Sequence, residues 1–181
     1  MTAAVFMETA ELTIRRATLD DAVLLAELGA KTFSDTFAAD NTPEDMAAYL
    51  AAAFGPTQQA AELTDPHCVA LIAEKDSVAI GYALLRTHAA PDCITGHQPV
   101  ELVRLYVAQE SIGSGVGAML MQSCIDEART IGFDTLWLGV WEHNQRAQKF
   151  YLKWDFQTVG THAFQLGTDT QTDYLMQRGL D

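Results

Sequence analysis

The sequence predicts a single α/β domain, and three observations carry this prediction. Nearly continuous apolar runs at 100–107 and 135–141 are typical of strands that are covered on both faces. A helical pattern at 116–131 lies between them, so the two strands should be parallel neighbours joined by a crossover helix. The chain has 181 residues, enough to bury one sizeable core. We expect residues 12–181 to form this domain and residues 1–11 to be a flexible arm.

The N-terminal half predicts a strand, two helices and a hairpin, in that order. Alternating apolar residues predict a strand at 12–16, and either aspartate at 20–21 can cap the helix that follows. Pro43 opens a second helix with acidic residues in its first turn, and the Gly-Pro pair at 55–56 ends it. Two apolar runs, 67–74 and 77–86, predict a β-hairpin with Lys75 and Asp76 between them.

The C-terminal half predicts two helices and three strands. The helix at 116–131 carries one apolar stripe, and Gly132 closes it. Asn144 can cap a second amphipathic helix after the strand at 135–141. Strand-like runs at 156–164 and 172–180 complete the chain.

Composition excludes several classes of function. A formal net charge of −13 argues against nucleic acid and anionic membranes as partners. No stretch reaches the roughly 20 apolar residues of a membrane helix, and the N-terminus has no signal-peptide pattern, so we expect a cytoplasmic protein. The three cysteines form no disulfide framework. The histidines, cysteine and aspartate of the loop at 88–99 match no zinc spacing, so we expect no metal.

Three glycines at 113, 115 and 117 separate a buried strand from a helix. Such a loop directs several backbone N–H groups to one point, where the helix dipole adds positive potential. The natural ligand is a phosphate or pyrophosphate, and glycine lets it approach the backbone closely.

Alternative explanations of this loop can be weighed against the rest of the chain. No Gly-Lys-Ser/Thr follows, which excludes a nucleoside-triphosphate P-loop. "GSGVGA" matches the dinucleotide pattern, but only about sixty residues follow it, too few for the further βα units of that fold. Asp134, at the spacing of the ribose-binding acid, precedes its strand instead of ending it. A plain turn without a ligand also remains open.

"LYVAQESIGSGVGAML" and "WLGVWEHNQRAQKFYLKWDF" together resemble the two main elements of the GNAT family of N-acetyltransferases. The segments "TFSDTFA", "EDMAAYLAAAF" and "GTHAFQLGTDTQTDYLMQRGL" resemble the branch related to the polyamine acetyltransferase PaiA. The resemblance covers the chain from about residue 12. It implies a central mixed β-sheet with a splayed parallel strand pair, flanked by about four helices. Two positions depart from the family pattern: Ile112 replaces Gln or Arg, and Asp155 replaces Gly.

The resemblance implies acetyl-CoA as co-substrate and assigns residues to it. Residues 113–118 would hold the pyrophosphate, and Asn144 would contact the pantetheine arm. A main-chain N–H near Leu105, Tyr106 or Val107 would polarise the thioester carbonyl. The complete set of expected cofactor-binding residues is Leu105, Tyr106, Val107, Gly113, Ser114, Gly115, Val116, Gly117, Ala118, Asn144, Ala147 and Lys149. Because Ile112 offers no side-chain donor, we expect weaker CoA binding, carried more by backbone amides.

The acceptor is expected to be a small primary amine, with spermidine-like polyamines as the first choice. Tyr151 is the candidate general acid, and Glu101 is the candidate base. The expected substrate-binding residues are Phe33, Asp35, Phe37 and His162; Glu44 and Asp45 are further candidates to hold ammonium groups. Amino acids, aminoglycoside-like compounds and protein amines are alternative acceptors. A CoA-binding regulator of the same fold is an alternative function, and the resemblance also implies a homodimer.

Overall fold

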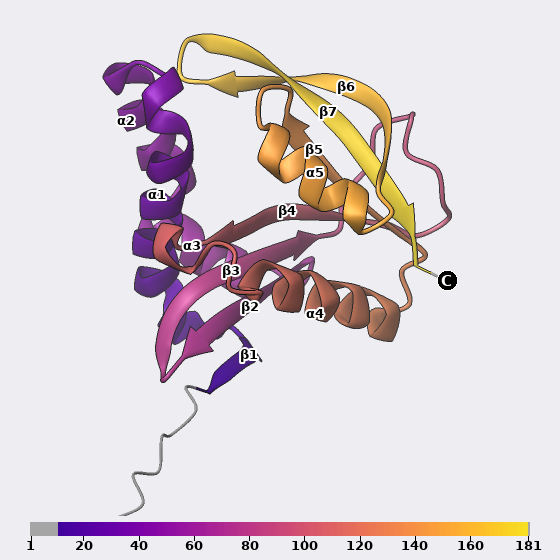
Figure 1. Cartoon of the computed structure of the whole chain (residues 1–181), viewed down its shortest axis with the longest axis horizontal. Helices are drawn as coiled ribbons and strands as arrows, with labels where there is room; N and C mark the ends of the chain where they lie inside the picture. Colours follow the sequence, from indigo (N-terminus) through magenta and orange to yellow (C-terminus); the bar gives the residue numbers. More distant parts are fainter. Residues whose placement is uncertain (1–10, 181) are drawn as a thin grey trace, which may run out of the picture.

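The computed structural model describes residues 11–180, and its centre is a seven-stranded sheet with the strand order β1-β2-β3-β4-β5-β7-β6 (Figure 1). All neighbouring strands are antiparallel except β4 and β5, which are parallel as predicted. Residues 1–10 of the expected arm lie outside the described residues. The strands are β1 Leu12–Arg16, β2 Cys68–Lys75, β3 Val78–Arg86, β4 Pro99–Val107, β5 Thr135–Trp141, β6 Gln157–Leu166 and β7 Asp169–Gly179.

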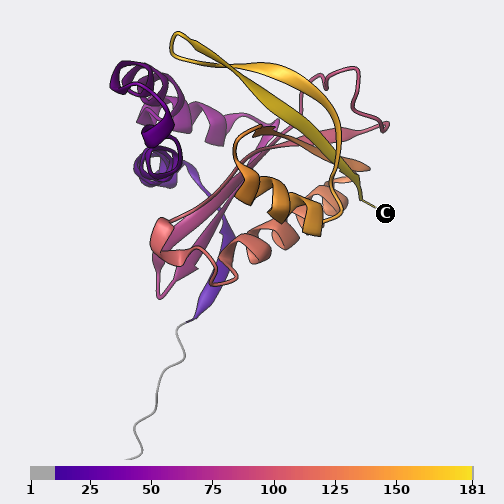
Figure 2. The same ribbon diagram turned by 45° about the horizontal axis from the view of Figure 1, so that its top comes forward.

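Helices cover both faces of the sheet, and Figure 2 shows how they divide. One group lies on one face: α1 Ala22–Phe37, α2 Pro43–Ala53 and α3 Pro56–Thr64. The other face carries α4 Val116–Ile131 and α5 Gln145–Lys153. The mixed sheet with its flanking helices confirms the predicted fold class. No helix within the described part of the chain has the length and apolarity needed to cross a membrane.

The parallel strands β4 and β5 separate after a short paired stretch. Only Pro99 to Glu101 pair with Thr135 to Trp137, whereas β4 continues to Val107 and β5 to Trp141. The two strands therefore diverge toward their carboxyl ends and leave an opening in the sheet, which confirms the predicted splay.

A bulge in β4 changes which side chains face which helices. The register against β3 shifts between Leu84 and Leu85, so Val103 has no partner there. As a result Val103 and Arg104 both lie on the side of α1, although side chains of consecutive strand residues normally alternate. The bulge thus directs Arg104 toward α3 instead of into the core beneath α4.

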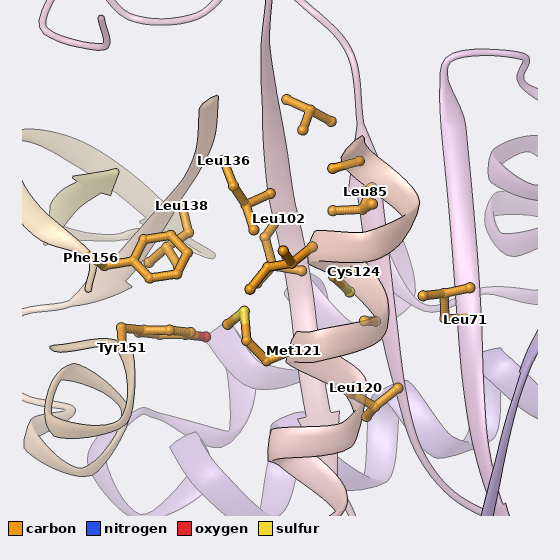
Figure 3. Close-up of a cluster of buried hydrophobic side chains, with 14 of the residues drawn as sticks. Leu71, Leu85, Leu102, Leu120, Met121, Cys124, Leu136, Leu138, Tyr151 and Phe156 are labelled. Carbon is orange, nitrogen blue, oxygen red and sulfur yellow. The ribbon is translucent and has the colours of Figure 1, made fainter. Parts of the chain in front are cut away.

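The main core lies between the sheet and the helices α4 and α5 (Figure 3). Apolar residues of the strands β2 to β5 pack here against one stripe of α4, with Leu120, Met121 and Cys124 fully buried. Cys124 thus has the structural role of a small apolar side chain. Figure 3 shows the Tyr151 side chain of α5 entering this core with its hydroxyl directed toward Met121.

Three local expectations need correction. Pro56 does not merely follow the end of α2; it begins the additional helix α3, which was missed because its sequence "PTQQAAELT" is mostly polar. The hairpin turn is formed by Asp76 and Ser77, both with positive φ, one residue later than expected. Asp21 occupies the N-cap position of α1 but makes no cap bond to that helix, because its carboxylate binds Arg15 and Thr18 instead.

Candidate active site

A cleft of about 680 Å³ lies at the opening between β4 and β5 and receives residues from both faces of the sheet. It brings together fourteen of the eighteen residues that the sequence analysis assigned to catalysis, acetyl-CoA or the acceptor; the two further candidates, Glu44 and Asp45, do not line it. They are Phe33, Phe37, Glu101, Leu105, Tyr106, Val107, Gly113, Gly115, Gly117, Ala118, Asn144, Ala147, Tyr151 and His162.

Four of the proposed residues do not line the cleft. The Val116 side chain is buried in the core, and the Ser114 hydroxyl donates to the Ser111 carbonyl oxygen. Each residue therefore has only its backbone groups available for a ligand at the glycine loop. Lys149 lies on the exposed side of α5. Asp35 forms an ion pair with Lys31 at 2.8 Å on the surface of α1.

The glycine loop ends where α4 begins, and this junction supplies free donors. The Met119 N–H donates to the Gly115 carbonyl oxygen at 3.0 Å, which leaves the three preceding amides of the helix without an intrahelical acceptor. Gly113 and Gly115 have φ values of 86° and 91°, which L-residues with a side chain rarely adopt. A Cβ on either glycine would meet no protein atom within 4 Å, so the space beside the loop is open.

Side chains around this junction add little charge. Ile112 is 41% exposed at the cleft, where it offers no hydrogen-bond donor. Arg146, in the first turn of α5, also lines the cleft, and no ion pair engages it among the described residues. Backbone amides, the α4 dipole and Arg146 together make this end of the cleft suitable for a phosphate group.

Helix α5 begins beside the opening in the sheet. The Asn144 side chain caps it by accepting a hydrogen bond from the Ala147 N–H at 3.1 Å, as predicted. Two turns later Tyr151 is 9% exposed, and no hydrogen bond to its hydroxyl is present among the described residues. Burial raises the pKa of Tyr151 well above its ordinary value, so the hydroxyl stays protonated and can donate a proton. Asp155 adopts φ 62° in the turn after α5, which shows that aspartate accepts the conformation usually given to glycine.

Glu101 is the last residue of β4 that pairs with β5, so it lies where the opening between these two strands begins. It lies between Val100 and Leu102, which both face the α4 core, so its side chain points to the opposite face of the sheet. The Glu101 Oε2 lies 2.5 Å from the Nε2 of His88, a residue of the loop at 88–99. The ring of His88 packs in turn against Trp137, with centroids 5.4 Å apart.

A second carboxylate, Asp173, was missed by the sequence analysis. Its Oδ2 lies 3.5 Å from His162 Nε2, and both side chains line the cleft on the face that Glu101 also occupies. Gly139 of β5 leaves room for them, since a Cβ there would lie 3.2 Å from both polar atoms. Burial raises the pKa of Asp173, an effect that His162 opposes. Only the pairing of β6 with β7 brings these residues together, so no local motif could have revealed Asp173.

The charged groups deeper on this face are already paired. Arg104 and Arg86 both bind Glu62 of α3, with their closest contacts at 2.5 Å and 2.8 Å. Phe54 covers the Arg104 guanidinium, 5.1 Å from its ring centroid. Arg104 is therefore a buried structural charge with Glu62 as its partner.

Aromatic side chains of α1, α2 and the β6–β7 hairpin line the same side of the cleft. Phe33 packs against Phe37 and Tyr49, with ring centroids 4.5 Å and 4.6 Å apart. The hairpin is fastened to α2 by the Thr168 N–H, which donates to Asp45 Oδ1 at 2.5 Å. Asp45 is thus buried in a structural contact and does not line the cleft, so it does not take the acceptor-binding position that was expected for it.

Comparisons with known proteins place the chain among acetyltransferases. Residues 30–156 match the model of the acetyltransferase (GNAT) family. An uncharacterised N-acetyltransferase of Mycobacterium bovis is 37% identical over 163 residues, covering 90% of this chain and 99% of the relative. One from Lactobacillus delbrueckii subsp. lactis is 33% identical over 150 residues, 83% of this chain and 87% of the relative.

Solved structures show the same fold. The PaiA N-acetyltransferase from Thermoplasma acidophilum, solved in complex with coenzyme A, has a TM-score of 0.75 and 21% identity and covers 93% of this chain and 99% of its own. The putative acetyltransferase yncA from Salmonella typhimurium, solved with acetyl-CoA, has a TM-score of 0.68 and 24% identity, with 95% of each chain covered. The splayed sheet, the glycine loop and the match over most of the chain lead to one conclusion: this chain belongs to the acetyltransferase (GNAT) family.

Proposed function

We propose that the protein is an acetyl-CoA-dependent N-acetyltransferase that acetylates a primary amine of a small polycationic molecule, with spermidine-like polyamines as the first choice. The observation that carries the proposal is the cleft through the splayed sheet. It has free amide donors of α4 at one end and two carboxylates, Glu101 and Asp173, on the opposite face of the sheet. An anionic and a cationic substrate can therefore meet between β4 and β5.

The residues on the α4 and α5 side fit the co-substrate. The amides at 116–118 and the open space beside Gly113 and Gly115 suit a pyrophosphate. The edge of β4 beyond Glu101, which β5 leaves unpaired, offers main-chain groups to the thioester carbonyl and the pantetheine arm. The proposed contacts of Asn144 and Ala147 lie at the start of α5, along the same opening.

The residues on the other side fit an amine. Glu101 and Asp173 supply negative charge, and Phe33, Phe37 and Tyr49 supply apolar surface for an alkyl chain. A polyamine combines these features, since its ammonium groups are joined by methylene segments. His162, beside Asp173, is proposed to contact the acceptor as well.

Chemistry at the cleft follows from these positions. Glu101 removes a proton from the acceptor ammonium, and a backbone N–H of β4 near Leu105 polarises the thioester carbonyl. Tyr151 then gives a proton to the departing sulfur. Among the described residues the cleft lining contains no Cys, Ser or Lys that could carry an acetyl group, which favours direct attack by the amine in a ternary complex.

Other acceptors share this chemistry. One protein of the same fold, from Brucella melitensis, is named a ribosomal-protein-alanine N-acetyltransferase, so a protein amine is a specific alternative. Amino acids and aminoglycosides are others. A non-catalytic CoA-binding regulator would use only the α4 end of the cleft and would not need the two carboxylates.

A two-step experiment tests the proposal. Acetyl-CoA should raise the thermal midpoint of the protein by mass action, whereas NAD and NADP should not. Thiol release is then measured with spermidine, spermine, lysine, an aminoglycoside and a peptide with N-terminal alanine, and the polyamines should give the highest kcat/KM. If acetyl-CoA binds and no amine releases thiol above background, the protein is a regulator; a preference for the peptide would replace the polyamine.

A further inference from the structure

We infer that His88 is the group through which Glu101 passes the proton of the acceptor amine to solvent. The inference rests on the proposed function and extends it from the cleft to the surface. Its basis is one contact: His88 Nε2 lies 2.5 Å from Glu101 Oε2, so the cleft carboxylate touches a histidine outside the cleft.

The two side chains differ in exposure in the way that a proton exit requires. The Glu101 side chain is 18% exposed, whereas that of His88 is 42% exposed. Because Oε2 faces the histidine, Oε1 is the oxygen left for the substrate. Histidine is suited to this step because it exchanges protons with water near neutral pH.

The residues around the His88–Glu101 pair hold it in place, and those that carry a charge or a proton are engaged with other partners. Trp137 of β5 packs against the His88 ring and carries no titratable group. Arg86, the cross-strand neighbour of Glu101 on β3, is engaged by Glu62 and Cys68. The titratable residues that β6 and β7 contribute to the cleft are His162 and Asp173, which are paired with each other.

The proton balance is as follows. The acceptor ammonium gives one proton to Glu101, and the carboxyl group gives it to His88 Nε2; the imidazolium then releases a proton to water. The neutral amine forms the new C–N bond, and the thioester C–S bond breaks. The sulfur leaves with the bonding electron pair and takes a proton from the Tyr151 hydroxyl. The acylated nitrogen then gives its extra proton to the Tyr151 oxygen and so restores the hydroxyl. No atom changes oxidation state.

The test compares His88→Gln with His67→Gln, which removes another exposed histidine directly before β2. The His67 backbone accepts a hydrogen bond from the Thr87 N–H, but its side chain has no hydrogen bond or ion pair with Glu101, so it is a control for losing a nearby histidine. The reaction is followed by thiol release with the best amine of the panel. The first variant should lower kcat about tenfold with KM for both substrates nearly unchanged, because one proton-transfer group is lost. Added imidazole should restore kcat in proportion to its concentration, since it carries the proton instead. The second variant should behave as the parent does.

A double-variant experiment separates this role from a structural one. In a Glu101→Gln background the His88→Gln change should have no further effect on kcat, because the proton never reaches the histidine. A loss that is equal in both backgrounds and insensitive to imidazole would mean that the contact only anchors the loop, and unchanged kcat in His88→Gln would also overturn the inference. If no amine is acetylated although acetyl-CoA binds, the proposed function fails and the inference with it.

Discussion

The two faces of the sheet are built in different ways, although both contribute to one cleft. On the α4 side the proposed co-substrate contacts come from two continuous segments, 105–118 and 144–151. On the α1 side the acceptor contacts come from β4, from α1 and α2, and from the β6–β7 hairpin. The residues of the first face are close together in the sequence, in a loop and at the starts of two helices. The second face forms only after strands that are far apart in the sequence have paired. This difference predicts that changes on the α4 side alter acetyl-CoA use and changes on the α1 side alter amine use.

The largest expected effect comes from Tyr151, which is proposed to act in the transfer step itself. Tyr151→Phe removes the proposed general acid while keeping the ring in its core position, so kcat should fall about 100-fold. The thermal midpoint should change little, because the hydroxyl makes no hydrogen bond to the described residues. Thiol release and thermal unfolding measure the two effects. Unchanged turnover would remove Tyr151 from the mechanism.

Gly115→Ala tests the α4 side. It places a methyl group in the open space beside the loop and imposes a strained φ, so acetyl-CoA should bind at least about tenfold more weakly. Gly132→Ala, at the other end of the same helix and also in open space with φ 104°, is the matched control. Both should lose roughly 1–2 kcal/mol of stability. If calorimetry shows equal affinity losses in both, the loop does not hold the phosphates.

Asp173→Asn tests the α1 side and should separate binding from stability. The KM for the amine should rise about five- to tenfold through loss of a charge-assisted contact, with KM for acetyl-CoA unchanged. Burial raises the pKa of Asp173, so the folded state holds a proton there more tightly than the unfolded chain does. The ionised carboxylate therefore lowers stability at pH 7, and the variant should have a higher thermal midpoint.

The pH dependence supplies the control for this variant. The gain in stability should shrink as the pH falls through the raised pKa and disappear below the ordinary value of about 3.9, where aspartate is protonated in both states. A gain that persists at that acidity would point to packing instead of charge. An unchanged amine KM would exclude Asp173 from acceptor binding.

The smallest expected effect belongs to Ile112→Gln. Glutamine would add a neutral donor at an exposed position of the cleft beside the loop, so acetyl-CoA should bind roughly threefold more tightly. Calorimetric titration measures the change, and KM for the amine should stay constant. Weaker binding would show that the apolar side chain itself contributes to the site.

The same contrast explains how much could be predicted from the sequence. The glycine loop and the Asn144 cap were predictable because each depends on neighbours in the chain. The splay of the parallel strand pair was implied only by the family resemblance. The carboxylate of Asp173 and the contact of His88 with Glu101 depend on strand pairing and on a loop path that no local pattern encodes. Asp45 resembled a free acid at a helix start, yet the hairpin tip covers it. Helix α3 was missed because its inward residues Gln59 and Glu62 are polar, bound to the Ala53 carbonyl oxygen and to Arg104.

The central claim is that an amine and acetyl-CoA meet directly in the opening between β4 and β5. Initial rates should be measured over a range of acetyl-CoA concentrations at several fixed concentrations of the best amine. Direct transfer in a ternary complex predicts double-reciprocal lines that intersect. Parallel lines, the pattern of an acetylated enzyme intermediate, would contradict the account.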